Sequence, residues 1–210
     1  MIRHEPARFG IALRNEDGVV VIVVLTALLI MAISASALLR SVEAAVAVTG
    51  NLGFMHAALA GADDAVENAV AALFEQHRIA DPTAEDAANG YFPSRQAGEN
   101  ARGVPLALQA LANYPPDAPA LEAGNGNVVR FVIERMCLAA GPVTADNCSL
   151  VPIVEPPLAI PGEPYTEPPR VPVFRQTIRV DGPAHATQFV QAWLADLPDR
   201  RRLAWRALAD

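Results

Sequence analysis

The stretch GVVVIVVLTALLIMAISASALLR, from Gly18 to Arg40, decides the fold of this chain. From Val19 to Leu39 it contains 21 residues without a charged side chain. At about 1.5 Å per residue, a helix of this length spans roughly 30 Å, the thickness of the hydrocarbon core of a bilayer. Apolar residues fall on every side of it, so the stretch predicts a helix that lies in lipid or in a bundle of similar helices.

A short polar segment precedes this helix. It carries charges of both signs: Arg3, Arg8, Arg14, Glu5, Glu16 and Asp17. A secretory signal has a shorter apolar core and a small-residue cleavage site after it, whereas this core is longer and no such site ends it before Arg40. The processing point is therefore predicted before the apolar run, between Gly18 and Val19, which makes residues 1–18 a leader.

A polar leader, a glycine and an uninterrupted apolar helix resemble the layout of a prepilin. Residues 14–75 are similar to the N-terminal region of PilX-type minor pilins of type IV pili, in which an apolar run ending in Leu-Arg precedes an "AGN"-like element and an Ala-rich acidic helix. Thr49, Gly50 and Asn51 occupy the place of that element. The Ala-rich acidic place is occupied by Ala57, Ala58, Ala60, Asp63, Ala65 and Glu67. A weaker likeness to the last strands of such proteins covers residues 174–194.

The resemblance implies an α+β, ladle-shaped subunit whose long N-terminal helix packs on a small antiparallel sheet. It also implies a bacterial inner-membrane protein with a periplasmic C-terminal domain, and a place in the pilus fibre after assembly. The implied partners are prepilin peptidase, the inner-membrane assembly platform, the major pilin, other minor pilins and, before assembly, membrane lipid. Major pilins mostly place a register-setting glutamate five residues after the cleavage point. This chain has Val23 at that position. PilX-type pilins and K-type pseudopilins also commonly lack the glutamate, so Val23 favours a minor pilin over a major one.

The helical pattern continues beyond Arg40 as far as Arg78. An apolar stripe recurs at steps of three and four residues: Phe54, Ala58, Ala62, Val66, Ala69, Val70 and Leu73. We therefore expect residues 19–40 to form the membrane or filament-core half of one helix, roughly 90 Å long in total, and residues 41–78 its periplasmic half. Gly50, Gly53 and Gly61 predict either a weak stretch that bends or a close contact with the following domain.

Residues 79–197 are expected to form a small α+β domain. Leu106 to Tyr114 predicts a short helix, and strands are predicted from Asn127, from Pro172 and from Ala184, the last two joined at residues 181–183. The proline-rich segment 151–173 predicts an extended chain that supplies no sheet interior. Residues 198–210 form a basic tail, for which a short amphipathic helix is the expectation.

Cys137 and Cys148 are the only cysteines, and they close a short loop. In an exported protein such a pair most often forms a disulfide, and two cysteines without a nearby histidine make a poor zinc site.

No residues combine into a catalytic motif. His56 and His77 lie 21 residues apart on the expected helix, and neither His4 nor His185 has a partner in the sequence. Asp63, Asp64 and Glu67 could hold a cation, although exposed acidic helix faces are much commoner. The formal net charge of −7 argues against nucleic acid as a partner. We expect neither enzymatic activity nor a cofactor.

A structural minor pilin that helps to prime or assemble a type IV pilus is the preferred interpretation. Two alternatives stay open: a K-type tip pseudopilin of type II secretion, and an uncleaved single-pass membrane protein whose periplasmic domain binds a partner or ligand.

Overall fold

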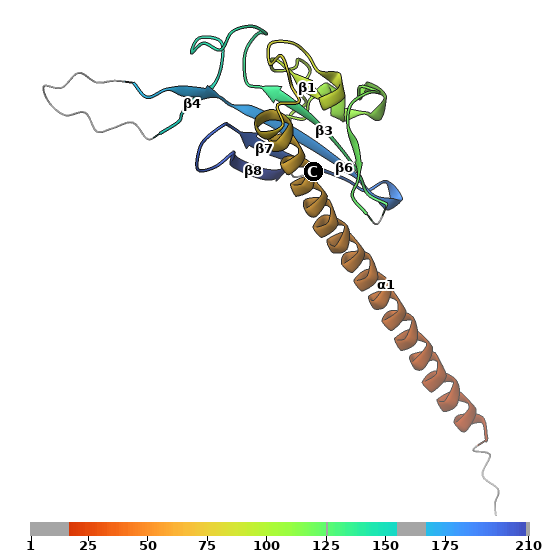
Figure 1. The fold of residues 1–210 in the computed structure, drawn as a ribbon. Coiled ribbons are helices and arrows are strands. Elements are labelled where there is room, and N and C mark those ends of the chain that lie inside the picture. The colour runs from red at the N-terminus through yellow and green to blue at the C-terminus, as the bar shows by residue number, and fades with distance from the viewer. Residues whose placement is uncertain (1–16, 125, 155–166, 209–210) are drawn as a thin grey trace, which may run out of the picture. The chain divides into compact units, whose positions relative to one another are not determined.

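The computed structural model describes residues 17–124, 126–154 and 167–208 (Figure 1). It consists of two compact units, Met1–Asn51 and Leu52–Asp210. The predicted leader lies outside the described residues except for Asp17 and Gly18. The middle of the proline-rich segment, residues 155–166, also lies outside them.

Helix α1 runs without interruption from Asp17 to Val70 and is followed by a π-helical turn, Ala71–Glu75. With this turn included, the helical segment ends at Glu75, three residues before the predicted end at Arg78, and His77 then adopts a left-handed backbone conformation with φ 47°. The three glycines do not unwind α1. Gly61 confirms the prediction of a close contact with the following domain, since a Cβ atom there would lie 2.9 Å from the Cβ atom of Ala123.

The apolar stripe of the second unit is confirmed by its burial. Five of its residues, Ala58, Ala62, Val66, Ala69 and Val70, belong to the main hydrophobic core, and Phe54 and Leu73 pack against that core. The acidic residues between them, Asp63, Asp64 and Glu67, are exposed. This helical face covers one side of a sheet, where it meets apolar residues of three strands: Val129, Phe131, Ile133, Ile178, Val180, Val190 and Leu194.

The sheet has six strands, in the order β1 (Tyr91–Phe92), β3 (Val128–Arg135), β6 (Phe174–Asp181), β7 (Thr187–Leu194) and β8 (Arg202–Leu208), with β2 (Ala120–Glu122) also paired to β3. The expectation of an antiparallel sheet is wrong for one strand, because β1 runs parallel to β3. A parallel neighbour needs a long crossover, and residues 93–127 provide it. They include the short helix α2 (Leu106–Gln109) and a 3₁₀ turn, Leu111–Asn113, where a single short helix was predicted. The α+β class holds.

The C-terminal tail corrects a prediction. Residues 202–208 form the edge strand β8 and not an amphipathic helix. Pairing with β7 gives this segment backbone hydrogen bonds along one side. Trp205 packs against the main core, and Leu208 is buried on the opposite face of the sheet. The alternating side chains of a strand can reach both faces, whereas an isolated amphipathic helix would bury only one stripe.

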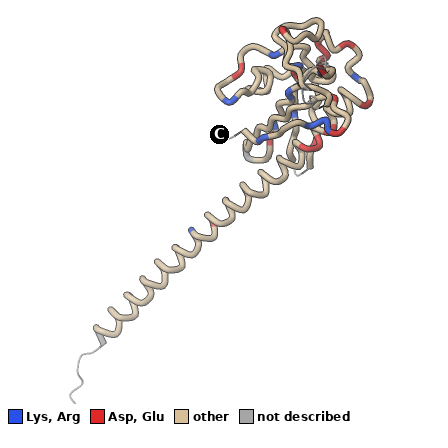
Figure 2. Tube along the Cα trace, turned by 90° about the vertical axis from the view of Figure 1, so that its left-hand side faces the viewer, with Lys and Arg blue, Asp and Glu red and all other residues tan. Residues whose placement is uncertain are grey.

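The second face of the sheet carries a smaller core. It consists of Phe92, Val104, Leu108, Val132, Phe189 and Leu208, so the crossover segment covers this face. The ends of the proline-rich segment form a separate two-stranded sheet, β4 (Leu150–Pro152) with β5 (Arg170–Pro172). Figure 2 shows that charged residues are frequent in the second unit. Between Val19 and Asn51, by contrast, only Arg40 and Glu43 are charged.

Candidate functional site

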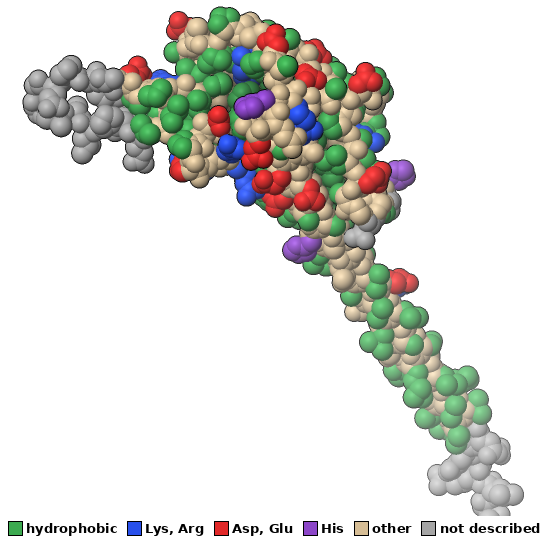
Figure 3. Space-filling model, in the orientation of Figure 1, with side chains coloured by type: hydrophobic (Ala, Val, Ile, Leu, Met, Phe, Trp, Pro, Cys, Tyr) green, Lys and Arg blue, Asp and Glu red, His purple; other side chains and the backbone are tan. Residues whose placement is uncertain are grey.

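The first part of α1 exposes a continuous apolar surface. Its large apolar side chains from Val19 to Leu39 are between 51 and 69% exposed, and Figure 3 shows hydrophobic atoms along the visible face of this segment. In the described part of the chain, one helix is long and apolar enough to cross a membrane. Water is a poor solvent for such a surface, so this segment needs lipid or other apolar helices around it.

The hydroxyl groups within this segment are satisfied inside the helix. The Thr26 hydroxyl donates to the carbonyl oxygen of Val23 at 2.9 Å, the Ser34 hydroxyl to that of Ile30 at 2.8 Å and the Ser36 hydroxyl to that of Ile33 at 2.8 Å. A polar group left without a partner in hydrocarbon costs several kcal/mol. These three bonds therefore make the segment compatible with an apolar environment over its whole length.

The predicted processing and register positions lie together at the start of α1. Gly18 and Val19 are in its first turn, and Val23 follows one turn later. The Val23 side chain is 59% exposed. A neighbouring molecule, lipid or protein, would meet it directly.

The predicted disulfide joins Cys137 to Cys148. Around it, the Leu138 amide donates to the carbonyl oxygen of Asn147 at 2.7 Å, and the Asn147 side chain bonds both backbone groups of Ala139. Both cysteines are buried, whereas residues 138–140 between them are exposed. The bridge closes the loop that follows β3 at the rim of the sheet.

Replacing Cys137 with serine is expected to lower the stability of the second unit by about 2–3 kcal/mol, because the unfolded chain gains the freedom of the opened loop. Urea unfolding of the purified full-length protein measures the loss. The Cys137→Ser/Cys148→Ser double variant is the control and should lose a similar amount, since no free thiol is then present. Unfolding midpoints that match the parent protein would contradict this expectation, as would free thiols at both positions in freshly purified protein.

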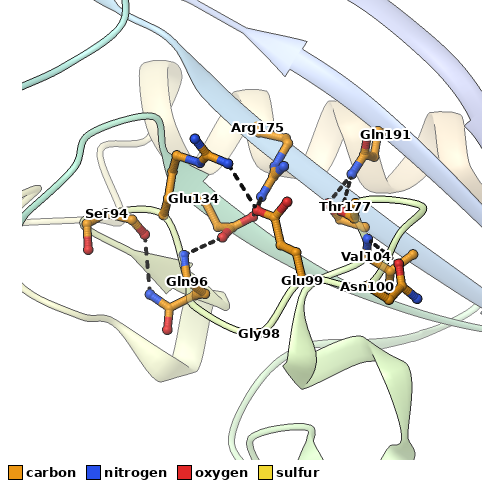
Figure 4. A network of polar contacts seen from close by, with 12 residues as sticks. Ser94, Gln96, Gly98, Glu99, Asn100, Val104, Glu134, Arg175, Thr177 and Gln191 are labelled. Carbon is orange, nitrogen blue, oxygen red and sulfur yellow. Dashed lines mark hydrogen bonds and ion pairs between the residues drawn. The ribbon is translucent and has the colours of Figure 1, made fainter.

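A buried ionic cluster, which the sequence analysis did not identify, lies on the face of the sheet opposite α1 (Figure 4). Glu134 of β3 and Arg175 of β6 are direct cross-strand partners and are 0 and 6% exposed. Arg175 donates to Oε2 of Glu134 through Nε at 3.1 Å and through Nη2 at 2.6 Å. Arg175 also pairs with Glu99 of the crossover, and the backbone amide of Gln96 donates to Oε1 of Glu134 at 2.8 Å.

This ionic cluster attaches the crossover to the sheet. Residues 96 and 99 both bond to side chains of central strands, and nearby Gln191 of β7 donates to the carbonyl oxygen of Gly103 at 2.7 Å. The hydrogen bond from Arg175 is the main reason why the pKa of Glu99 lies below its ordinary value. The two carboxylates share the buried guanidinium of Arg175, and Arg95 lies 3.7 Å from Glu99 at the exposed side, which suits a structural role.

The remaining residues considered from the sequence do not converge. Of the described histidines, His56 is on α1, His77 follows the π-helical turn and His185 ends a 3₁₀ turn, Pro183–His185. The Asp63 carboxylate is already hydrogen-bonded to β8, since the Arg202 guanidinium and the Trp205 indole donate to its Oδ1 at 2.8 and 3.1 Å. No three His, Cys, Asp or Glu residues within the described ranges form a group that could hold a metal ion.

The sequence pattern places the arginine of the ionic cluster on one face of a strand but does not predict its burial. In FRQTIRV (174–180), Phe174, Gln176, Ile178 and Val180 alternate with Arg175, Thr177 and Arg179. The second set faces away from α1, where a solvated surface is the ordinary expectation for a strand. The crossover, which is distant in the sequence, covers that face and buries its side chains.

The chain matches no protein-family model, no curated protein and no solved structure in the three comparisons. The functional interpretation therefore depends on the residues and geometry described above.

Proposed function

We propose that this chain is a structural minor pilin of the PilX type, which helps to prime or assemble a type IV pilus. In this proposal, residues 1–18 are removed by a prepilin peptidase at the cytoplasmic face of the inner membrane, and the second unit lies in the periplasm. The apolar segment 19–40 holds the subunit in lipid until it enters the complex that initiates a filament.

The observation that supports this proposal best is the uniformly exposed apolar surface of α1 in a chain whose next unit has its own complete core. The helix residues that serve the core begin at Phe54, so the segment 19–40 is not needed to complete it. Transfer from lipid into a bundle of similar helices keeps this surface away from water at both stages. The partners are therefore other minor pilins, the major pilin and the assembly platform.

A K-type tip pseudopilin uses the same kind of helix. The short soluble part of this chain favours the pilus over the secretion system within this class.

A membrane anchor that is never cleaved is a second candidate, and one observation favours it. Helix α1 already includes Asp17 and Gly18, so the peptide bond between Gly18 and Val19 lies inside a helical turn. The acidic residues Glu16 and Asp17 also stand where prepilin leaders usually have basic ones. In this case the second unit would serve as a periplasmic binding domain on a single-pass anchor.

Processing separates the two candidates. We expect the N-terminus of the protein purified from cells with the peptidase to be a methylated Val19, and Gly18→Leu to leave the full-length chain in the membrane, because bulk before the scissile bond obstructs the peptidase. Intact-mass measurement and N-terminal sequencing of the membrane fraction give both results.

Gly18→Ala is the matched control. It keeps a small residue and should still be processed in a substantial fraction of molecules. An intact Met1 in the parent protein, with the same gel mobility in cells with and without the peptidase, would show that the chain is an uncleaved anchor.

A further inference from the structure

An open pocket of about 450 Å³ lies at the end of the helix within the second unit. This is within the range of about 300–1,000 Å³ typical of small-molecule sites. Its walls are mainly apolar and come from the π-helical turn, the segment after it, the loop closed by the disulfide, β5 and β6: Leu73, Phe74, Ile79, Val143, Val171 and Phe174. The ionic cluster at Arg175 does not line it.

A single buried cation, Arg135, also lines this pocket and is 1% exposed. Its guanidinium donates through Nε to the carbonyl oxygen of Pro93 at 3.0 Å and through Nη2 to that of Gly141 at 2.7 Å. Both acceptors are neutral. Among the described residues, no hydrogen bond reaches the Nη1 atom of Arg135 and no carboxylate forms an ion pair with it.

The acidic groups near this pocket are already engaged. Asp196 lines it, but its carboxylate faces Nε of Arg201 at 3.6 Å. Asp81 accepts hydrogen bonds from the Thr83 amide and hydroxyl at 2.8 and 2.6 Å, which lower its pKa more than the charge of Arg135 does. A buried guanidinium without a hydrogen-bonded carboxylate is costly, and its planar donors suit a carboxylate ligand.

The backbone beside the pocket is irregular in two respects. The π-helical turn Ala71–Glu75 places Leu73 and Phe74 in the wall, and π turns are frequent at functional sites. His77, another wall residue, has a left-handed conformation that costs a non-glycine residue about 1–3 kcal/mol. Local strain of this kind is concentrated at ligand sites.

We propose that this pocket binds a small organic acid consisting of an apolar group and one carboxylate. The apolar group lies against Phe74, Ile79 and Phe174, and the carboxylate accepts hydrogen bonds from Arg135. This site is independent of the proposed pilin role, because none of its residues belongs to the segment 19–40.

The test uses the full-length protein in micelles of a neutral maltoside detergent, with 4-phenylbutanoate as the probe and 4-phenylbutanamide as the uncharged control. We expect the acid to cause saturable shifts in the amide NMR signals of His77 and Ile79. The amide should bind roughly tenfold more weakly or worse, because it loses the charge-assisted hydrogen bonds. Equal binding of the two compounds, or no saturable shift with the acid, would overturn the proposal.

Two variants locate the site. Ala80→Trp places an indole at a wall position that is exposed, and it should abolish binding; Ala84→Trp makes the same change at an exposed position outside the wall and should not. Arg135→Met should reduce the affinity for 4-phenylbutanoate to that for 4-phenylbutanamide. If Arg135→Met does not fold, the comparison of Ala80→Trp with Ala84→Trp and of the acid with the amide still tests the site. Unchanged binding of the acid to Ala80→Trp would refute it.

A peptide C-terminus offers the same chemistry as a free acid. Acetyl-Ala-Phe with a free carboxylate distinguishes the two sources, because its backbone adds bulk that a site for a small acid does not accommodate. Weaker binding of this peptide than of 4-phenylbutanoate supports the small acid, and tighter binding assigns the pocket to a chain end instead.

Discussion

Replacing Arg175 with methionine is expected to lower the free energy of unfolding of the second unit by about 3–5 kcal/mol, the range measured when one partner of a buried ion pair is removed. Glu134 is 0% exposed, and within the described residues the Gln96 amide would be the one hydrogen-bond partner left to its carboxylate. Glu99 would lose its buried partner as well. Chemical denaturation of the full-length protein in detergent measures the change.

Arg130→Met is the matched control. It makes the same substitution on the neighbouring strand β3, where Arg130 forms an ion pair with Asp181 at 3.0 Å. Both of those side chains are about one-fifth exposed, and pairs in contact with solvent contribute at most about 1 kcal/mol. If Arg175→Met costs no more than Arg130→Met, the ionic cluster does not hold the crossover to the sheet.

The pH dependence provides a second readout of the same substitution. The pKa of Glu99 is lowered from its ordinary value of 4.5 by its hydrogen bond to Arg175. A lowered pKa stabilises the folded state above the ordinary value, and this contribution disappears as the pH falls through the lower, folded-state pKa. We expect Arg175→Met to lose less stability than the parent protein over that acidic range.

For the proposed minor pilin, Val23→Glu is expected to move the protein from the tip or initiating complex into the shaft of the filament. In the major pilins, where such a glutamate is usual, we expect it to meet the N-terminal amine of a neighbouring subunit. A carboxylate buried among apolar helices needs such a partner. A subunit with Val23 does not supply it, so we expect a few copies per pilus, at the tip or in the initiating complex, and fewer pili when the protein is deleted.

Immunogold labelling of sheared pili measures this distribution. Val24→Glu is the control, because it adds the same charge one position along α1, on a different side of the helix, and should not enter the shaft. Gold particles spread evenly along filaments that contain the unmodified protein would refute the proposed position.

The local sequence pattern was sufficient to predict an element and its buried face wherever apolar residues repeat at a helical or strand period. The stripe from Phe54 to Leu73 indicated the buried face of α1, and the alternation in residues 128–135 and 174–180 indicated β3 and β6, because each period brings apolar side chains to one side. The disulfide was predictable for a similar reason, since only two cysteines lie close together in the sequence. The pairing of β8 with β7 and the parallel direction of β1 could not be predicted from the sequence, because both depend on which strands the tertiary structure brings together.

The sequence by itself determined the apolar helix, the core-facing stripe of its second half, the α+β class and the Cys137–Cys148 pairing. These follow from composition, periodicity and short separations, which act locally. Only the tertiary structure decided that the basic tail is a strand, that Glu134, Arg175 and Glu99 form a buried cluster, and that Arg135 lines a pocket. In each case the charge of an arginine predicts solvent, and it is the packing of distant segments over it, stabilised by specific hydrogen bonds, that places it against the sheet or in the interior.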